Sequence, residues 1–191
     1  MALTSTILRF QVELADIDRN KYETMSFQVP QHPSESADRV VVRLLAYLML
    51  FEDNIAFGRG LSTPEDPAVH ITDLSGQLLL WIEVGAPSAE RLHRSNKRTK
   101  RLEVFSHKYA NNLAREWKKS AVHEQEKIRI TLFDTKTIAA IAETLSRQNE
   151  WVLTIHEGLL QLAAAGENYQ IEPSCYEGLN AFFESQNDTT R

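Results

Sequence analysis

The chain has 191 residues, of which 42% are hydrophobic and 25% charged, as is usual for a single globular domain. Its net charge of −5 argues against a protein that binds polyanions over its whole surface. The one cysteine, Cys175, cannot form an internal disulfide or a cysteine-based zinc cluster. No apolar stretch is long enough to span a membrane, and no secretory signal is visible, so we expect a cytoplasmic protein.

The N-terminal third predicts a hairpin followed by a helix. Residues 6–15 alternate between apolar and polar, which is typical of a half-buried strand, and residues 22–30 predict the returning strand. Acid and cap chemistry at residues 33–35 predicts a helix that runs to about residue 52. Two glycines and two prolines in residues 58–67 indicate a loop.

The remainder alternates between predicted strands and helices. We expect strands at residues 78–84, 102–106, 127–133, 151–155, 159–163 and 169–171, and helices from residue 87, over 110–120 and over 136–147. This order predicts an α/β fold with a mixed sheet flanked by helices. We expect a single domain over residues 1–184 and a polar C-terminal tail over 185–191.

Glu83 lies near the end of the apolar run Leu78-Leu79-Leu80-Trp81-Ile82-Glu83-Val84-Gly85, which predicts a strand covered on both faces. A carboxylate in such a strand loses its water and needs a cation, a hydrogen-bond donor or a proton. If the chain turns back at Ser75-Gly76, Asp73 approaches Glu83, and two such carboxylates suit Mg²⁺ or Mn²⁺. The alternative is that Asp73 belongs only to its turn and that Glu83 pairs with an arginine.

The first predicted helix carries a polar stripe, in which Glu35, Arg39, Arg43 and Tyr47 follow one another at intervals of four residues. Arg43 stands between apolar residues, so we expect it to be buried and bonded to an anion, either Glu83, Glu35 or a ligand phosphate. The alternative is a ladder of surface ion pairs, each worth roughly 0.2–0.5 kcal/mol.

Positive charge is concentrated between residues 88 and 101, where six cations accompany one acid. Four arginines recur at i, i+3, i+7 and i+10, namely Arg91, Arg94, Arg98 and Arg101. On one helical face they could follow a phosphate backbone, and the helix would begin close to Glu83. The alternative is a solvated surface helix.

Several common motifs do not occur. The six histidines show no HxH or HExxH spacing, which argues against a zinc site. The sequence contains no GxGxxG, P-loop or GxSxG motif, so neither a dinucleotide site nor a nucleophile elbow is indicated. We expect Trp81, Trp117 and Trp151 in the core.

Several segments together resemble the YaeQ family. They are Met1-Ala2-Leu3, Ala15-Asp16-Ile17-Asp18-Arg19, His32-Pro33-Ser34-Glu35, Arg43-Leu44-Leu45-Ala46-Tyr47, Phe57-Gly58-Arg59-Gly60-Leu61 and Trp81-Ile82-Glu83-Val84-Gly85-Ala86-Pro87. The resemblance covers essentially the whole chain in order. It implies a small bacterial protein of undefined cellular role, whose fold is a variation on the PD-(D/E)XK, or restriction-endonuclease-like, nuclease fold.

The resemblance also implies a site. Nuclease folds of this type carry an Asp at one strand start, Asp/Glu-x-Lys on the next strand, and often a Glu on the first helix. In this chain those acids would be Asp73, Glu83 and Glu35. The position of the Lys is occupied by Gly85, which cannot stabilise charge or position water.

Two functions follow as alternatives. The first is a metal-dependent phosphodiesterase acting on nucleic acid, in which Asp73 and Glu83 hold Mg²⁺ or Mn²⁺ and Glu35 completes the site. Four arginines would engage phosphate without acting as bases: Arg39, Arg43, Arg91 and Arg94. The second is a non-catalytic descendant of the same fold that binds nucleic acid or a protein partner.

Overall fold

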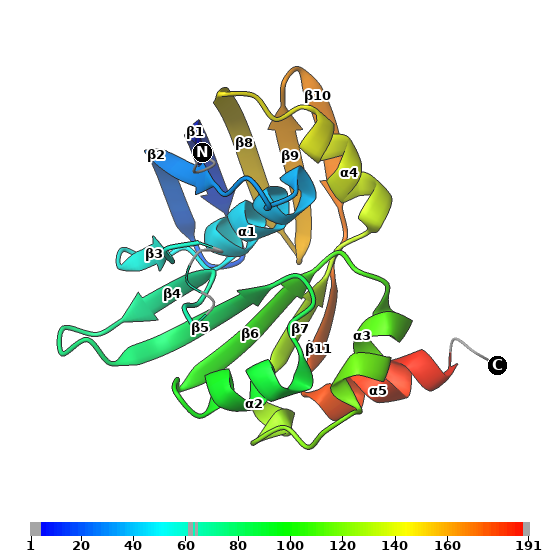
Figure 1. The fold of residues 1–191 in the computed structure, drawn as a ribbon. Coiled ribbons are helices and arrows are strands. Elements are labelled where there is room, and N and C mark those ends of the chain that lie inside the picture. The colour runs from blue at the N-terminus through cyan, green and yellow to red at the C-terminus, as the bar shows by residue number, and fades with distance from the viewer. Residues whose placement is uncertain (1–4, 61–62, 64, 189–191) are drawn as a thin grey trace.

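The computed structural model describes residues 5–60, 63 and 65–188 (Figure 1). Its strands are β1 (Thr6–Asp16), β2 (Lys21–Gln31), β3 (Ile55–Phe57), β4 (Val69–Thr72), β5 (Leu78–Val84), β6 (Arg101–Ser106), β7 (Arg129–Leu132), β8 (Gln148–His156), β9 (Leu159–Ala164), β10 (Glu167–Ile171) and β11 (Ser174–Glu177). Its α-helices are α1 (Ala37–Met49), α2 (Ala89–Asn96), α3 (Ala110–Trp117), α4 (Thr135–Glu143) and α5 (Leu179–Asp188), and residues Gln125–Lys127 form a 3-10 turn. None of the helices in the described ranges is long and apolar enough to cross a membrane.

The first sheet has the strand order β10-β9-β8-β1-β2. β1 and β2 pair antiparallel from Thr6↔Gln31 to Asp16↔Lys21, which confirms the predicted N-terminal hairpin. β8 pairs parallel with β1, and β9 and β10 continue antiparallel. Alternate residues of β1 are buried, so one face of this sheet packs on the core and the other faces solvent.

The second sheet has the order β11-β7-β6-β5-β4-β3. β5, β6 and β7 run parallel, and the outer strands are antiparallel to their neighbours. The mixed α/β class is therefore confirmed, but the expectation of one sheet is wrong because the chain builds two. The edge strands β3 and β11 were not predicted, since three or four residues are too few to display a strand period.

The helices complete a layered molecule (Figure 1). α1 and α4 contribute to a core shared with the inner face of the first sheet and one face of the second. α2, α3 and α5 cover the other face of the second sheet in a separate core. The predicted core positions of Trp81, Trp117 and Trp151 are confirmed, since all three are buried.

Two predicted boundaries are wrong. α1 begins after Ser36, whose side chain accepts a hydrogen bond from Arg39 N, and it ends at Met49, earlier than expected. The predicted tail over residues 185–191 begins inside α5, which extends to Asp188, and residues 189–191 lie outside the described ranges. α5 is anchored by the buried Phe182, whose ring centroid lies 5.1 Å from that of Trp117.

Candidate functional site

A cleft of about 380 Å³ lies at the carboxyl ends of β5 and β6. Its walls come from the start of α1, the connection before β4, the end of β5 and the residues after β6. Among the described lining residues are four cations, Arg39, Arg43, Arg91 and Lys108, and two acids, Asp66 and Glu83. Open α/β sheets commonly bind ligands at the carboxyl ends of their strands, so this is the candidate site.

On the α1 side of the cleft, Glu35 joins two arginines. Its Oε1 accepts a hydrogen bond from Arg39 Nη1, and its Oε2 accepts one from Arg43 Nη2 at 2.9 Å. Because Ser36 caps α1, Glu35 precedes the helix, contrary to the prediction that it lies on it. The expectation that Arg43 is buried and bonded to a carboxylate is confirmed, and the partner is Glu35: both side chains are only 1% exposed.

Arg43 makes only part of the contacts that its guanidinium could make. Nη2 also donates to Pro30 O at 3.0 Å, and the guanidinium carbon lies 5.7 Å from the Phe57 ring centroid. Nε and Nη1 are buried and have no hydrogen-bond partner among the described residues. Burial lowers the pKa of Arg43, against the opposing charge of Glu35, but arginine does not deprotonate in proteins. One carboxylate therefore serves two positive charges here.

On the α2 side, Glu83 is buried in a network of donors. Its Oε1 accepts hydrogen bonds from Trp81 Nε1 at 2.8 Å and from Ser95 Oγ at 3.0 Å, and it pairs with Arg91 Nε at 2.7 Å. This is the alternative predicted from sequence, in which Glu83 pairs with an arginine. A metal ion would have to compete with these three donors for that oxygen.

Asp73 lies at the other end of β5. Its carboxylate accepts hydrogen bonds from Ser75 Oγ at 2.6 Å, Ser75 N at 2.8 Å and Gln77 N at 2.9 Å. These bonds lower the pKa of Asp73, with the Ser75 hydroxyl the largest cause. The β4–β5 turn precedes Leu78, so five strand residues, roughly 17 Å, separate the turn from Glu83. The predicted approach of Asp73 to Glu83 is wrong.

This placement removes the predicted two-acid metal site. Asp73 and Glu83 cannot share one ion, because the antiparallel register of β4 and β5 puts the turn at the strand end opposite Glu83. Within the described ranges, no group of three or more His, Cys, Asp or Glu side chains is placed to hold a metal ion. The predicted ligands therefore do not fit Mg²⁺ or Mn²⁺.

Asp66 is the cleft acid that sequence reasoning missed. It precedes β4, where Ala68 N donates to Ile82 O at 2.9 Å and so brings this connection beside the end of β5. Its carboxylate accepts hydrogen bonds from Arg59 Nε at 2.5 Å and Nη2 at 3.0 Å, and Arg59 lowers the pKa of Asp66. The available signal was an Asp-Pro pair at the start of the strand that precedes the Glu83 strand.

His107 and Lys108 follow β6 and line the cleft. The His107 side chain is 1% exposed, and neither ring nitrogen has a hydrogen-bond partner among the described residues. Its Nε2 lies 3.8 Å from Asp38 Oδ2. Burial lowers the pKa of His107, Lys108 lowers it further, and Asp38 opposes both effects. The lowered pKa favours the neutral imidazole of His107, whose two ring nitrogens have no hydrogen-bond partner among the described residues.

The basic segment does not form one cationic helical face. α2 ends at Asn96, so Arg98 and Arg101 lie beyond it. Arg98 stacks 5.0 Å from the Trp81 ring centroid, and Arg101 pairs with Glu103 from within β6. Arg94 is not among the lining residues of the cleft and lies, exposed, 4.0 Å from Glu90. Of the four arginines in the predicted face, Arg91 is the one in the cleft.

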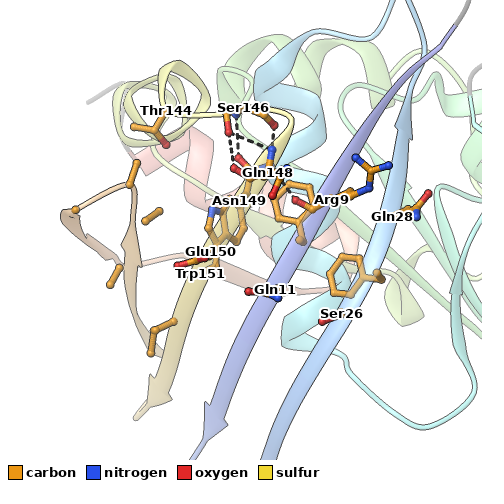
Figure 2. Close-up of a pocket in the computed structure, with 17 residues that line it drawn as sticks. Arg9, Gln11, Ser26, Gln28, Thr144, Ser146, Gln148, Asn149, Glu150 and Trp151 are labelled. Carbon is orange, nitrogen blue, oxygen red and sulfur yellow. Dashed lines mark hydrogen bonds between the residues drawn. The ribbon is translucent and has the colours of Figure 1, made fainter.

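A larger hollow of about 790 Å³ lies against the first sheet, next to the turn that precedes β8 (Figure 2). At one end of it, Ser146 N donates to Asn149 Oδ1 at 2.9 Å and Asn149 Nδ2 donates to Ser146 O at 2.8 Å. The lining charges are one cation, Arg9, and one acid, Glu150. The hollow spans β2, β1, β8 and β9, and its two lining charges balance, so we do not assign a site to it.

The fold and the cleft together define a mixed α/β protein with a positively charged site at the ends of parallel strands. Residues 1–173 match the family model described as YaeQ protein, and the chain belongs to this family. The resemblance noted in the sequence is thereby confirmed.

Relatives and solved structures agree over nearly the full length. The "Uncharacterized protein YaeQ" of Salmonella typhi is 27% identical over 180 residues, which are 93% of this chain and 98% of that protein, and the Escherichia coli (strain K12) protein is 26% identical with the same coverage. The crystal structure of YaeQ protein from Pseudomonas syringae aligns with a TM-score of 0.84 at 29% identity, covering 91% of this chain and 97% of that one. The crystal structure of the YaeQ protein from Xanthomonas axonopodis pv. citri aligns with a TM-score of 0.78 at 27% sequence identity, covering 92% of this chain and 99% of that one.

Proposed function

We propose that this chain is a cytoplasmic protein that binds nucleic acid through phosphate groups in the cleft and does not cleave it. The observation that carries this proposal is the charge left over after pairing. Glu35 compensates one of its two arginines, and Lys108 makes no ion pair within the described part of the chain. Asp38 Oδ2 lies 3.8 Å from His107 Nε2 and adds one negative charge near the cleft. Arginine and lysine in excess at a strand end suit phosphate oxygens.

In this proposal the chain descends from a nuclease with a PD-(D/E)XK-type fold and no longer has the catalytic site of such a nuclease. Under this proposal, Asp66 before β4 and Glu83 at the end of β5 would be the remaining acids of such a site. Glu83 is engaged by Arg91, and Gly85 replaces the motif lysine with a backbone at φ +100°. A site that keeps its cations while its carboxylates are paired supports binding better than hydrolysis.

The test is binding measured alongside cleavage. Labelled single- and double-stranded DNA and RNA are titrated with the full chain, and fluorescence anisotropy is followed at several salt concentrations. We expect affinity to fall as salt rises, with a log–log slope of about −0.7 to −0.9 for each phosphate contacted, and no shortened product in Mn²⁺. Absence of binding to all four nucleic acids would refute the proposal and leave a protein partner as the alternative.

The second candidate is a slow phosphodiesterase dependent on Mg²⁺ or Mn²⁺. The observation in its favour is that Asp66 and Glu83 line one cleft. Cleavage by the wild-type chain in Mn²⁺ that disappears in Asp66→Asn and Glu83→Gln would establish it. Asp73→Asn is the matched control, because Asp73 lies at the far end of β5 and its substitution should leave such cleavage unchanged.

A further inference from the structure

The cleft holds most of the unsatisfied buried nitrogens of the described chain. Among the described residues, five buried side-chain nitrogen atoms lack a hydrogen-bond partner, and four of them belong to Arg43 and His107, which line the cleft. The fifth, His70 Nδ1, belongs to a residue that does not line the cleft. Buried donors and acceptors are nearly always paired in native proteins, by protein groups or by bound molecules, so a cluster of unpaired ones in a cleft marks a place where a bound molecule can supply the missing atoms.

The chemistry of the four nitrogens specifies that ligand. Nε and Nη1 of Arg43 are donors only, and a neutral His107 adds one N–H donor. A group that satisfies these three donors must present several acceptor oxygens, and a negative charge suits it because Glu35 leaves one arginine charge uncompensated. The other ring nitrogen of neutral His107 is an acceptor. The acids that line the cleft are already engaged, Glu83 by Arg91 and Asp66 by Arg59.

We propose that the cleft takes a terminal phosphate, the monoester at the end of a nucleic-acid strand or on a mononucleotide, between Arg43 and His107. This inference rests on the proposed phosphate-binding function and narrows it to a chain end. A phosphate monoester carries about −1.5 to −2 charges and three acceptor oxygens near neutral pH, whereas an internal phosphodiester carries one charge.

The depth at which Arg43 and His107 lie in the cleft favours a terminal phosphate over an internal one. Both side chains are only 1% exposed, so a phosphate flanked by sugars on both sides and lying on the surface would not reach them. A terminal phosphate has one flanking sugar and can enter the cleft. The volume of about 380 Å³ lies in the small-ligand range, which suits a single nucleotide at the strand end. Lys108, which makes no ion pair within the described part of the chain, also lines the cleft and suits a following phosphate.

The experiment compares one oligonucleotide sequence in four forms: 5′-phosphorylated, 3′-phosphorylated, hydroxyl at both ends, and circular. Binding to the full chain is measured by anisotropy competition. We expect at least one phosphorylated form to bind about tenfold more tightly than the hydroxyl-ended and circular forms, the scale of one charge-assisted hydrogen bond. Equal affinity for all four forms would overturn the terminal-phosphate assignment while leaving the proposed function intact.

Two matched variants assign the preference to residues. His107→Phe removes both ring nitrogens from the cleft, and His70→Phe removes another partly unsatisfied histidine outside it. Folding of each is checked by thermal denaturation. The preference should disappear in His107→Phe and persist in His70→Phe; a preference that survives in folded His107→Phe would refute the role of His107.

A separate arm identifies the source of the phosphate. Adenosine monophosphate and inorganic phosphate are added to the wild-type chain and to His107→Phe, and melting temperatures are compared. If no oligonucleotide binds but these small phosphates stabilise only the wild type, the terminal-phosphate site stands and the nucleic-acid function falls. If nothing binds, both fall.

Discussion

At the residue scale, the positive charge of the cleft arises because one carboxylate, that of Glu35, pairs with two arginines. Glu35 accepts from Arg39 and Arg43 with different oxygens, and its burial prevents water from replacing it. The sequence left the partner of Arg43 open between Glu83, Glu35 and a ligand phosphate. The four-residue spacing could not decide it, because that rule applies within a helix and Glu35 precedes α1. The unpaired ring of His107 could not be predicted, since a single histidine after an apolar strand gives no signal of its surroundings.

Glu35→Gln tests the importance of that shared acid. The substitution keeps the shape of the side chain but leaves the buried Arg43 without its countercharge, which should lower the free energy of unfolding by about 3–5 kcal/mol in urea denaturation. Glu90→Gln is the matched control, because Glu90 and Arg94 are 77% and 57% exposed and 4.0 Å apart, and such pairs contribute little. Equal losses in the two variants would contradict the account.

Buried histidines predict a pH dependence of stability. Burial lowers the pKa of His107 below its ordinary 6.5 and also lowers that of His70, against the charge of Asp66. As the pH falls toward 6.5, the unfolded chain therefore binds protons that the folded chain does not. The free energy of unfolding should keep its full value above about pH 7 and decline as the pH falls through about 6.5. His107→Phe should reduce this decline, leaving the part due to His70. Identical pH profiles for the variant and the wild type would show that His107 does not contribute.

At the scale of elements, the β4–β5 hairpin decides which acids meet. The sequence predicted the turn after Asp73 and the apolar β5 strand with Glu83 near its end, but the expected approach of Asp73 to Glu83 overlooked the length of strand between the turn and Glu83. Counting along the predicted strand would have shown this, because each strand residue adds about 3.3 Å. α5 was not predicted for a different reason. Its few apolar residues, such as Leu179 and Phe182, lie in a polar segment, and only the folded structure shows that they are buried against α3.

Phe182 makes the docking of α5 measurable. It is fully buried and packs against Trp117 and Tyr176, so Phe182→Ala should cost about 3–5 kcal/mol of unfolding free energy. The adjacent Phe183 is only partly buried and lies 5.1 Å below Lys118 Nζ, so Phe183→Ala should cost much less. If the two substitutions were equally mild, α5 would not be a docked element.

Gly85 limits how far the nuclease site could be rebuilt. Its φ of +100° is a region that side chains rarely adopt, although a Cβ there would meet no atom within 4 Å. Gly85→Lys and Gly85→Ala should each lose about 1–3 kcal/mol of stability through backbone strain. We expect the folded Gly85→Lys protein to remain inactive on nucleic acid in Mn²⁺, because Glu83 stays bound to Arg91. Cleavage by this variant and not by Gly85→Ala would instead support the phosphodiesterase alternative.

At the scale of the whole molecule, two sheets and two helical layers place the cleft and the open sheet face on different parts of the surface. The cleft lies where β5 and β6 end beside α1, and the larger polar hollow lies on the first sheet (Figure 2). Periodicity predicted most of these strands and helices, but not that they would form two sheets, because strand pairing between residues far apart in the chain, such as β1 with β8, leaves no local signal.

The most direct test of the account compares two substitutions that each remove one positive charge. Lys108→Gln acts at the cleft, and Arg9→Gln acts at the polar hollow of the first sheet. The affinity of each folded variant for a labelled single-stranded oligonucleotide is measured across a salt series. We predict that Lys108→Gln weakens binding and reduces the salt slope by about one phosphate contact, whereas Arg9→Gln leaves both unchanged. Loss of affinity in Arg9→Gln with none in Lys108→Gln would contradict the central claim and move the nucleic-acid site to the sheet face.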